Sequence, residues 1–190
     1  LASPVFAANW ASVAERVEES IVRLMFSGEY GTGTCTGFVI DQKRDYVLTA
    51  AHCYGVDILA GGQLAVPILV DGENDLMVLQ VPGNPQKDLR ASEKVLRRGD
   101  EVATVGFGYG LDRPLFRHGF VADPEGVFEG LEEGYLSADN TFIPGMSGGP
   151  IVDKNANVVG IVQKTDNQTG LGRGIKVILE LTGKYWRVRG

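Results

Sequence analysis

One serine of this chain stands among residues that favour close approach of the backbone to a ligand. Residues 143–150 read Ile-Pro-Gly-Met-Ser-Gly-Gly-Pro, so Ser147 lies among three glycines and between two prolines. Glycine adopts backbone dihedrals that are closed to other residues. A serine held in such a turn is exposed and has backbone N–H groups beside it, which can stabilise negative charge on a carbonyl oxygen. The pattern indicates either a nucleophile for acyl transfer or an ordinary Gly/Pro turn between strands.

A nucleophilic serine needs a base, and the chain contains two histidines, His52 and His118. His52 follows an apolar run and two small residues, in the sequence VLTAAHC that begins at Val47. His118 lies in the strand-like run 115–120 and has no evident partner there. We therefore predict that His52 is the base and that His118 is structural.

The base in turn needs an acid that orients it. Asp75 stands at the head of the apolar run NDLMVLQV, which covers residues 74–81. An acid at the mouth of such a strand can be half-buried and accept a hydrogen bond from an imidazole N–H. The alternative is a turn aspartate that ends the loop 71–74. Asp57 and Asp71 are weaker candidates for the same role.

The order of these residues along the chain separates three architectures. An α/β-hydrolase also has its serine in a glycine-rich elbow, but its histidine follows the serine, and no histidine follows Ser147 here. A subtilisin-type order needs an acid before His52, for which Asp41 or Asp45 could be offered, on a scaffold much richer in helices. The order His52, Asp75, Ser147 is the chymotrypsin order.

Three motifs in this order resemble the trypsin-like, chymotrypsin-fold serine peptidases: TAAHC around His52, NDLMVLQV at Asp75 and GMSGGPIV around Ser147. The run TFIPGMSGGPIV resembles the HtrA/Deg protease domain in particular, without its PDZ domain. The resemblance covers roughly residues 20–180. It implies an all-β fold of two six-stranded antiparallel β-barrels with the active site between them. A single protease domain would then cover 1–190, with barrels at about 20–84 and 96–180 and a linker at about 85–95.

The resemblance also implies the role of each residue. Ser147 would attack a peptide carbonyl, His52 would transfer the proton, and Asp75 would hold His52 in the right tautomer. The backbone N–H groups of Gly145 and Ser147 would form the oxyanion hole. The implied activity is that of a serine endopeptidase acting on polypeptides, with no metal and no organic cofactor.

The specificity pocket of such an enzyme would be lined by Thr141, Val162 and Ile175. Trypsin has an acid six positions before the nucleophile, where this chain has Thr141, so a preference for lysine or arginine is not expected. The three residues suit a small or medium uncharged side chain. Lys164 or Lys176, if either were turned inward, would instead favour an acidic one.

The chain has two cysteines, Cys35 and Cys53, and with two histidines they form no zinc pattern. The resemblance implies a Cys35–Cys53 disulfide, which would stabilise the fold by about 3 kcal/mol. A disulfide implies an oxidising compartment; the alternative is two buried thiols in a cytosolic protein. The small, apolar residues 1–8 are interpreted as the tail of a secretory signal, and an ordinary mature N-terminus is the other interpretation. Together these features favour an extracytoplasmic location.

The remaining pattern supplies the elements that would position the site. Asn9 can cap a helix over 9–20, with Trp10, Val13 and Val17 on one face. Strands are expected at 21–26, 31–40, 64–70, 76–81, 101–107, 115–122, 157–164 and 172–177. An exposed acidic loop is expected at 123–133, and a short helix or extended tail at 178–186.

Composition and charge exclude several classes of protein. The chain has 190 residues, of which 44% are hydrophobic, enough for the core of one globular unit. The net charge of -6 argues against nucleic acid or an anionic membrane as the main partner. No apolar run reaches the length of a membrane span. Nothing in the sequence sets the oligomeric state.

One residue departs from the family pattern. Met146 stands directly before the serine, where the digestive enzymes have an acid and HtrA-type proteases have asparagine. A turn that is not preformed would leave the three catalytic residues silent. The alternative to an endopeptidase is therefore a latent or inactive protease-fold binding module. An esterase or a self-cleaving processing protease would share the chemistry and differ only in substrate.

Overall fold

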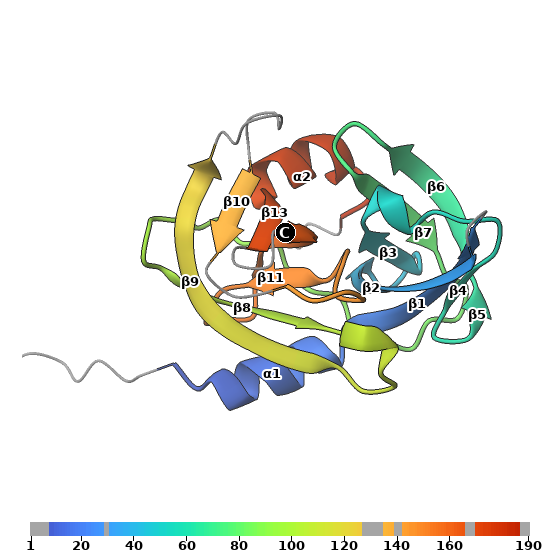
Figure 1. Ribbon diagram of the computed structural model, residues 1–190, viewed down its shortest axis with the longest axis horizontal. Coiled ribbons are helices and arrows are strands. Elements are labelled where there is room, and N and C mark those ends of the chain that lie inside the picture. Colours follow the sequence, from blue (N-terminus) through green and yellow to red (C-terminus); the bar gives the residue numbers. More distant parts are fainter. Residues whose placement is uncertain (1–7, 29–30, 127–134, 139–141, 166–169, 187–190) are drawn as a thin grey trace, which may run out of the picture.

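The protein is described by a computed structural model that covers residues 8–28, 31–126, 135–138, 142–165 and 170–186. Two antiparallel β-sheets lie side by side, and two short helices pack on them (Figure 1). The all-β fold with a helix near the N-terminus is thus confirmed. The two α-helices of the described part have nine and eight residues, and neither is long enough to cross a membrane.

The first sheet carries the histidine and the aspartate. Its strands are β1 (Ile21–Gly28), β2 (Gly31–Asp41), β3 (Tyr46–Thr49), β4 (Ile58–Ala60), β5 (Gln63–Leu64), β6 (Val66–Asp71) and β7 (Leu76–Gln80). They are ordered β5-β4-β1-β2-β3-β7-β6. This half is therefore an open seven-stranded sheet rather than the expected closed six-stranded barrel. The two edge strands are consecutive in the chain and separated by Ala65 alone, so the sheet curls back toward itself.

The second sheet is a closed barrel of six strands, as expected. Its strands are β8 (Glu101–Gly106), β9 (Leu115–Gly126), β10 (Tyr135–Ala138), β11 (Pro150–Val152), β12 (Val158–Thr165) and β13 (Gly170–Gly174). Strand β9 continues to Gly126, so residues 123–126 belong to a strand and not to the acidic loop expected there. The rest of that loop, 127–133, lies outside the described residues.

The C-terminal part of the fold differs from the sequence-based expectation. The strand expected at 172–177 ends at Gly174, and Ile175 begins the helix α2 (Ile175–Thr182). Ile178 and Thr182 are buried, and Leu179 packs against the core beside them. This spacing of three and four residues fits one face of a helix, whereas strand side chains alternate between faces. The strand prediction for 175–177 was therefore wrong.

The N-terminal helix α1 (Trp10–Glu18) closes one side of the molecule, and its prediction is confirmed. The side chain of Asn9 accepts a hydrogen bond from the N–H of Ser12, which caps the first turn. Val13 and Val17 are buried on the inner face. The indole ring of Trp10 packs on His118 of β9, with ring centroids 4.5 Å apart. The helix thus covers the outer face of the second barrel, below β9 in Figure 1.

A single hydrophobic cluster joins the two sheets. Phe38 and Leu48 of the first sheet lie in one buried cluster with Val105 and Ile161 of the second. Because protein interiors are packed at high density, such a shared core fixes the relative position of the two sheets. Residues on loops at the boundary between the sheets are consequently held in a defined geometry.

Asp41, at the end of β2, is a buried acid with a dense set of donors. Its carboxylate accepts hydrogen bonds from the backbone N–H groups of Lys43 and Arg44 and from Arg44 Nε, the last at 2.7 Å. Burial raises the pKa of the carboxyl group, but the hydrogen bonds and charge of Arg44 outweigh it and hold the pKa below its ordinary value of 3.8. The ionised form therefore stabilises the fold.

We expect Asp41→Asn to lower the free energy of unfolding at neutral pH, with a smaller effect in acid. A lowered folded-state pKa gives a stabilisation that is present above 3.8 and lost as the pH falls through the folded-state value. Urea unfolding of both proteins across this range measures the difference. The exposed Asp112→Asn variant is the control. A difference between Asp41→Asn and wild type that stays constant with pH would contradict the prediction.

Candidate active site

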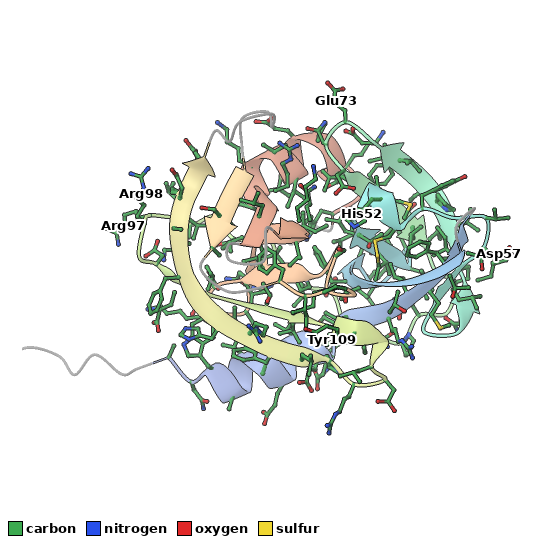
Figure 2. All side chains as sticks on the ribbon, viewed as in Figure 1. His52, Asp57, Glu73, Arg97, Arg98 and Tyr109 are labelled. Carbon is green, nitrogen blue, oxygen red and sulfur yellow. A yellow bond between two sulfur atoms is a disulfide. The ribbon has the colours of Figure 1, made fainter. Side chains whose placement is uncertain are left out.

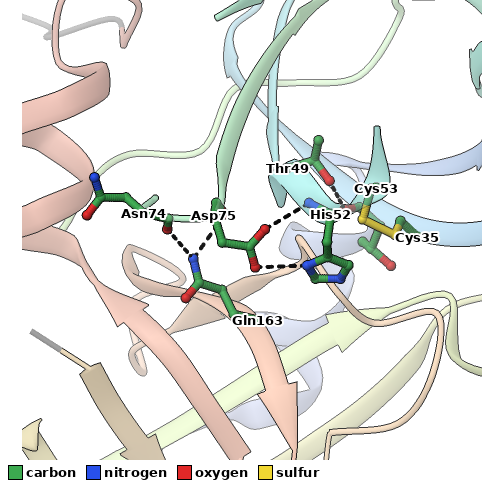
Figure 3. Close-up of polar contacts among 8 residues, drawn as sticks. Cys35, Thr49, His52, Cys53, Asn74, Asp75 and Gln163 are labelled. Carbon is green, nitrogen blue, oxygen red and sulfur yellow. Dashed lines mark hydrogen bonds and ion pairs between the residues drawn. A yellow bond between two sulfur atoms is a disulfide. The ribbon is translucent and has the colours of Figure 1, made fainter. Parts of the chain in front are cut away.

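His52 lies in the short 3-10 turn Ala51–Cys53, which follows the end of β3 at Thr49. Its side chain is 44% exposed, although the residues on both sides of it are buried. The sulfur of Cys53 is joined to that of Cys35 on β2 in the structure (Figure 3). The imidazole is therefore presented to solvent from a segment that is anchored to the neighbouring strand.

Asp75 is positioned by the tight connection between β6 and β7. The carboxylate of Asp71 accepts hydrogen bonds from the backbone N–H and the side-chain amide of Asn74, both at 3.0 Å, and so holds this connection. Asp75 itself has a left-handed backbone with φ 54°, a conformation that aspartate adopts more readily than most residues. Leu76 then begins β7, so Asp75 stands at the mouth of a buried strand, as predicted.

His52 and Asp75 are in direct contact. Asp75 Oδ1 accepts the backbone N–H of His52 at 2.8 Å, and Asp75 Oδ2 lies 2.8 Å from His52 Nδ1 (Figure 3). A carboxylate only accepts hydrogen bonds, so Nδ1 carries the proton and Nε2 is left as an acceptor. The side chain of Asp75 is 13% exposed. This pair has the geometry of a base with its orienting acid.

The other candidates for these two roles lie elsewhere. Figure 2 shows Asp57 at the outer edge of the first sheet, away from His52. Asp71 is engaged by Asn74. His118 contacts Glu101, with 3.3 Å between Nε2 and Oε1, on the outer face that α1 covers.

A residue that sequence reasoning missed ties the aspartate to the second barrel. Gln163 of β12 is buried, and its amide Nε2 donates to the carbonyl oxygens of Asn74 at 2.7 Å and Asp75 at 3.0 Å (Figure 3). These bonds hold the backbone of the acid from the second barrel. The signal in the sequence was a single amide side chain directly after the apolar run Val158–Val162.

Ser147 lies in the turn before β11, and two glycines let this turn pack closely against its neighbours. Gly145 has φ 95°, and a Cβ there would lie 2.3 Å from the carbonyl oxygen of Phe107. Gly148 has φ 79°, and a Cβ there would lie 2.1 Å from the hydroxyl of Thr49. No other residue fits these two positions without strain. Thr49 ends β3, so the turn lies against the strand that leads to His52.

The carbonyl groups of residues 144–147 all accept hydrogen bonds. The donors are Tyr109 N–H for Pro144 at 2.6 Å, the Thr36 hydroxyl for Gly145 at 2.8 Å, Gly149 N–H for Met146 at 2.9 Å, and Thr36 N–H for Ser147 at 2.9 Å. The carbonyls of the turn thus all have partners, whereas two of its N–H groups have none among the described residues. Within the described chain, neither Gly145 N–H nor Ser147 N–H donates a hydrogen bond. Two unpaired N–H groups beside a serine are what an oxyanion hole requires, and that role remains a prediction.

Met146 explains how the turn is anchored without the acid found in digestive enzymes. Its side chain is completely buried in the core of the second barrel, in one cluster with Leu136 and Ile151. Burying a methionine side chain stabilises by roughly 1.5–3 kcal/mol. An apolar anchor therefore holds the turn at this position.

The serine and the histidine are not joined in the structure. Among the residues that it describes, no hydrogen bond links the Ser147 hydroxyl to the His52 imidazole. The structure thus brings His52 and Asp75 together and packs the serine turn against β3, while the Ser147–His52 contact stays a prediction.

The residues predicted to line a specificity pocket lie in different environments. Val162 is buried beside the serine turn, where its carbonyl accepts the N–H of Gly148 at 2.8 Å. Ile175 is half-buried at the start of α2, Lys164 and Lys176 are exposed, and Thr141 lies outside the described residues. Their role in specificity stays a prediction.

One group of possible metal ligands occurs in the part of the chain that the structure describes. It consists of Cys35, His52 and Cys53, whose ligand atoms lie within 4.8 Å of one another. Zinc binds cysteine as the thiolate, and these two sulfur atoms are joined to each other in the structure. Joined in this way, neither sulfur is available as a thiolate ligand.

Comparison with known proteins gives a consistent result. The family model described as a trypsin-like peptidase domain matches residues 35–161, which include His52, Asp75 and Ser147. The uncharacterized protein y4bJ of Sinorhizobium fredii is 34% identical over 140 residues, covering 67% of this chain and 21% of that protein. The probable periplasmic serine protease do/HhoA-like of Haemophilus influenzae is 26% identical over 155 residues, covering 75% of this chain and 33% of that protein. The chain thus spans a third or less of the length of these two relatives.

Solved structures with the same fold cover nearly all of the chain. The active form of the Rv3671c protease of M. tuberculosis superposes with a TM-score of 0.81 at 24% identity, covering 99% of this chain and 90% of that one. The HtrA-type protease AlgW with a tripeptide gives a TM-score of 0.83 at 21% identity, covering 93% and 63%.

Proposed function

Since this chain belongs to the family of trypsin-like peptidases, we propose that it is a serine endopeptidase that cleaves polypeptides through an acyl-enzyme. The observation that carries the proposal is the contact between His52 and Asp75. The acid accepts both the backbone N–H and the Nδ1–H of the histidine at 2.8 Å, which sets the tautomer that a general base needs. The family membership supports the reaction class, and the geometry of this pair supports the roles.

In the proposed reaction the Ser147 hydroxyl oxygen attacks the carbonyl carbon of a peptide bond, and its proton moves to His52 Nε2. The carbonyl oxygen becomes an oxyanion that accepts hydrogen bonds from the N–H groups of Gly145 and Ser147. The C–N bond then breaks, and the leaving amine takes the proton from His52. Water attacks the resulting ester with His52 again as base, which releases the acid and regenerates Ser147. Asp75 stabilises the imidazolium in both halves.

The alternative is a latent or inactive binding module of the same fold. The unpaired N–H groups of Gly145 and Ser147 favour the enzyme, because a collapsed turn would direct them to protein acceptors.

Val162 beside the turn is proposed to line a pocket, with Thr141 and Ile175, for a small or medium uncharged side chain. Profiling with a mixed peptide library tests this preference.

A fluorophosphonate probe tests the proposed function. We expect it to label Ser147, identified by mass spectrometry, because only an activated serine reacts. The His52→Ala variant should fold and remain unlabelled, which separates activation from accessibility. Absence of labelling in the folded wild-type protein would support the binding module instead. Turnover of ester but not peptide substrates would indicate an esterase.

The cellular location is proposed to be extracytoplasmic. Several relatives are named as periplasmic proteases. The cysteine pair is consistent with this location, because disulfides persist in oxidising compartments.

We expect replacement of both Cys35 and Cys53 by serine to lower the free energy of unfolding, because it removes the proposed bond between them. The two residues are 18 positions apart, and closing a loop of that length stabilises by about 3 kcal/mol in the chain-entropy model. Chemical denaturation with and without reductant measures the loss. The reductant should destabilise the wild type and leave the double variant unchanged. Full alkylation of both thiols in the folded, unreduced protein would contradict the prediction.

A further inference from the structure

Thr36 is a fully buried polar residue on β2 that contacts three other segments of the chain. Its carbonyl accepts the Thr49 hydroxyl at 2.8 Å, at the end of β3. Its hydroxyl accepts the N–H of Phe107 at 2.9 Å, just after β8. Its remaining donors are directed to the serine turn. The residue therefore lies where both sheets and the serine turn meet.

Two hydrogen bonds connect Thr36 to the serine turn. The backbone N–H of Thr36 donates to the carbonyl of Ser147 at 2.9 Å, and its hydroxyl donates to the carbonyl of Gly145 at 2.8 Å. The first bond is made by the backbone, so any residue at this position other than proline could make it. The second requires a hydroxyl, because the side chain must donate to Gly145 and accept from Phe107 at once.

The hydrogen bond from the Thr36 hydroxyl to the Gly145 carbonyl affects how the N–H of Gly145 is oriented. Gly145 joins two peptide planes, one with the Gly145 N–H and one with the Gly145 carbonyl. Tyr109 N–H holds the first plane through Pro144 O at 2.6 Å, and Thr36 holds the second. Each plane is rigid, and the second also donates through the N–H of Met146 to the carbonyl of Ile143 at 3.0 Å, so these bonds together restrain both dihedrals of Gly145. Without the Thr36 bond, only the Met146 N–H still holds the second plane, and glycine readily adopts conformations that are closed to other residues.

The side chain of Thr36 is closely enclosed by its neighbours. A Cβ at Gly106 would lie 2.9 Å from the Thr36 hydroxyl, and one at Gly149 would lie 3.3 Å from its methyl group. Glycine at these two positions thus makes room for the threonine side chain, which is fully buried. Removing the hydroxyl would leave the carbonyl of Gly145 and the N–H of Phe107 buried without a partner.

We propose that Thr36 is a positioning residue whose hydroxyl sets the oxyanion-binding conformation of the serine turn. The inference rests on the proposed function, because it assigns a catalytic consequence to the Gly145 N–H. Thr36 touches no substrate and acts through Gly145. Its loss should weaken stabilisation of the transition state more than binding of the substrate.

The test compares Thr36→Val, which keeps the shape and removes the hydroxyl, with Thr36→Ser, which keeps the hydroxyl. We expect Thr36→Val to lower kcat by about ten- to a hundred-fold, since losing one oxyanion donor costs about a hundred- to a thousand-fold. KM should change by less than about three-fold, because ground-state binding is retained. Thr36→Ser should restore kcat to within about three-fold of wild type. The affinity for a peptide aldehyde, whose adduct carries an oxyanion, should fall in parallel with kcat.

A matched control separates positioning from stability. Thr182→Val removes a buried hydroxyl that donates to Ile178 within α2, so it should lower stability without lowering kcat. All rates are taken per active site, titrated to completion with fluorophosphonate. Thr36→Ala replaces Thr36→Val should the latter not fold. A kcat of Thr36→Val or Thr36→Ala equal to that of Thr36→Ser would overturn the positioning role of Thr36. The proposed function would still stand. A folded wild type without any turnover overturns the proposed function, and this inference with it.

Discussion

Ser147→Ala is expected to lower kcat by about a million-fold, to the level left by binding and oxyanion stabilisation alone. Alanine lacks the oxygen that would form the bond to the substrate carbonyl, so no acyl-enzyme can form. The fold should be unaffected, because the described Ser147 side chain makes no hydrogen bond and the turn is held by its backbone and by Met146. The measurement is cleavage of a fluorescent unfolded-protein substrate by wild type and variant at equal concentrations of folded protein.

Ser12→Ala supplies the control, since Ser12 is an exposed serine on α1, outside the candidate site. It should cleave the substrate at the wild-type rate. Retention of the full rate by Ser147→Ala would remove Ser147 as the nucleophile. The nucleophile would then be another residue near His52. The fold and the histidine–aspartate pair would be unaffected by this result.

Asp75→Asn is expected to lower kcat by about ten-thousand-fold while the structure stays intact. The reason lies in the two contacts of this carboxylate. The backbone N–H of His52 requires an acceptor, so the asparagine must turn its oxygen toward it and its NH2 group toward Nδ1. Nδ1 would then accept a hydrogen bond, and the proton of the neutral imidazole would move to Nε2. A protonated Nε2 cannot take the proton of Ser147.

The control for this substitution is Asp57→Asn, which makes the same chemical change at the outer edge of the first sheet (Figure 2). It should leave kcat unchanged. Thermal unfolding should show Asp75→Asn to be folded, since both hydrogen-bond positions remain occupied. Equal kcat values for Asp75→Asn and wild type would show that the contact with His52 is not catalytic, despite its 2.8 Å distance.

The candidate site depends on bonds that cross from one sheet to the other. Gln163 of the second barrel holds the backbone of Asp75, and Thr36 of the first sheet holds the carbonyl of Gly145. Gln163 thus reaches the half that carries His52 and Asp75, and Thr36 reaches the half that carries Ser147. The relative position of the sheets, fixed by the shared core, therefore controls the geometry of the site.

The sequence by itself determined which residues form the candidate site and in what order. His52, Asp75 and Ser147 each lie in a short motif, and the chemistry of such a motif depends on residues next to one another in the chain. The helix over 10–18 was equally local, because its cap and its apolar face lie within a few residues. The pairing of Cys35 with Cys53 came from the family resemblance, and the structure contains the same pair.

Only the tertiary structure decided how the site is held. The contacts of Gln163 with Asp75 and of Thr36 with Gly145 join residues 88 and 109 positions apart, and no local pattern reports such a contact. The anchor at Met146 also follows from the fold, since the second barrel buries this side chain. For residues 175–177 the sequence predicted a strand, whereas packing of Ile178 and Leu179 against the core makes them the first turn of α2. A short apolar run does not by itself distinguish a strand from a helix. Short motifs specify chemistry through neighbouring residues, whereas orientation depends on segments that meet only after folding.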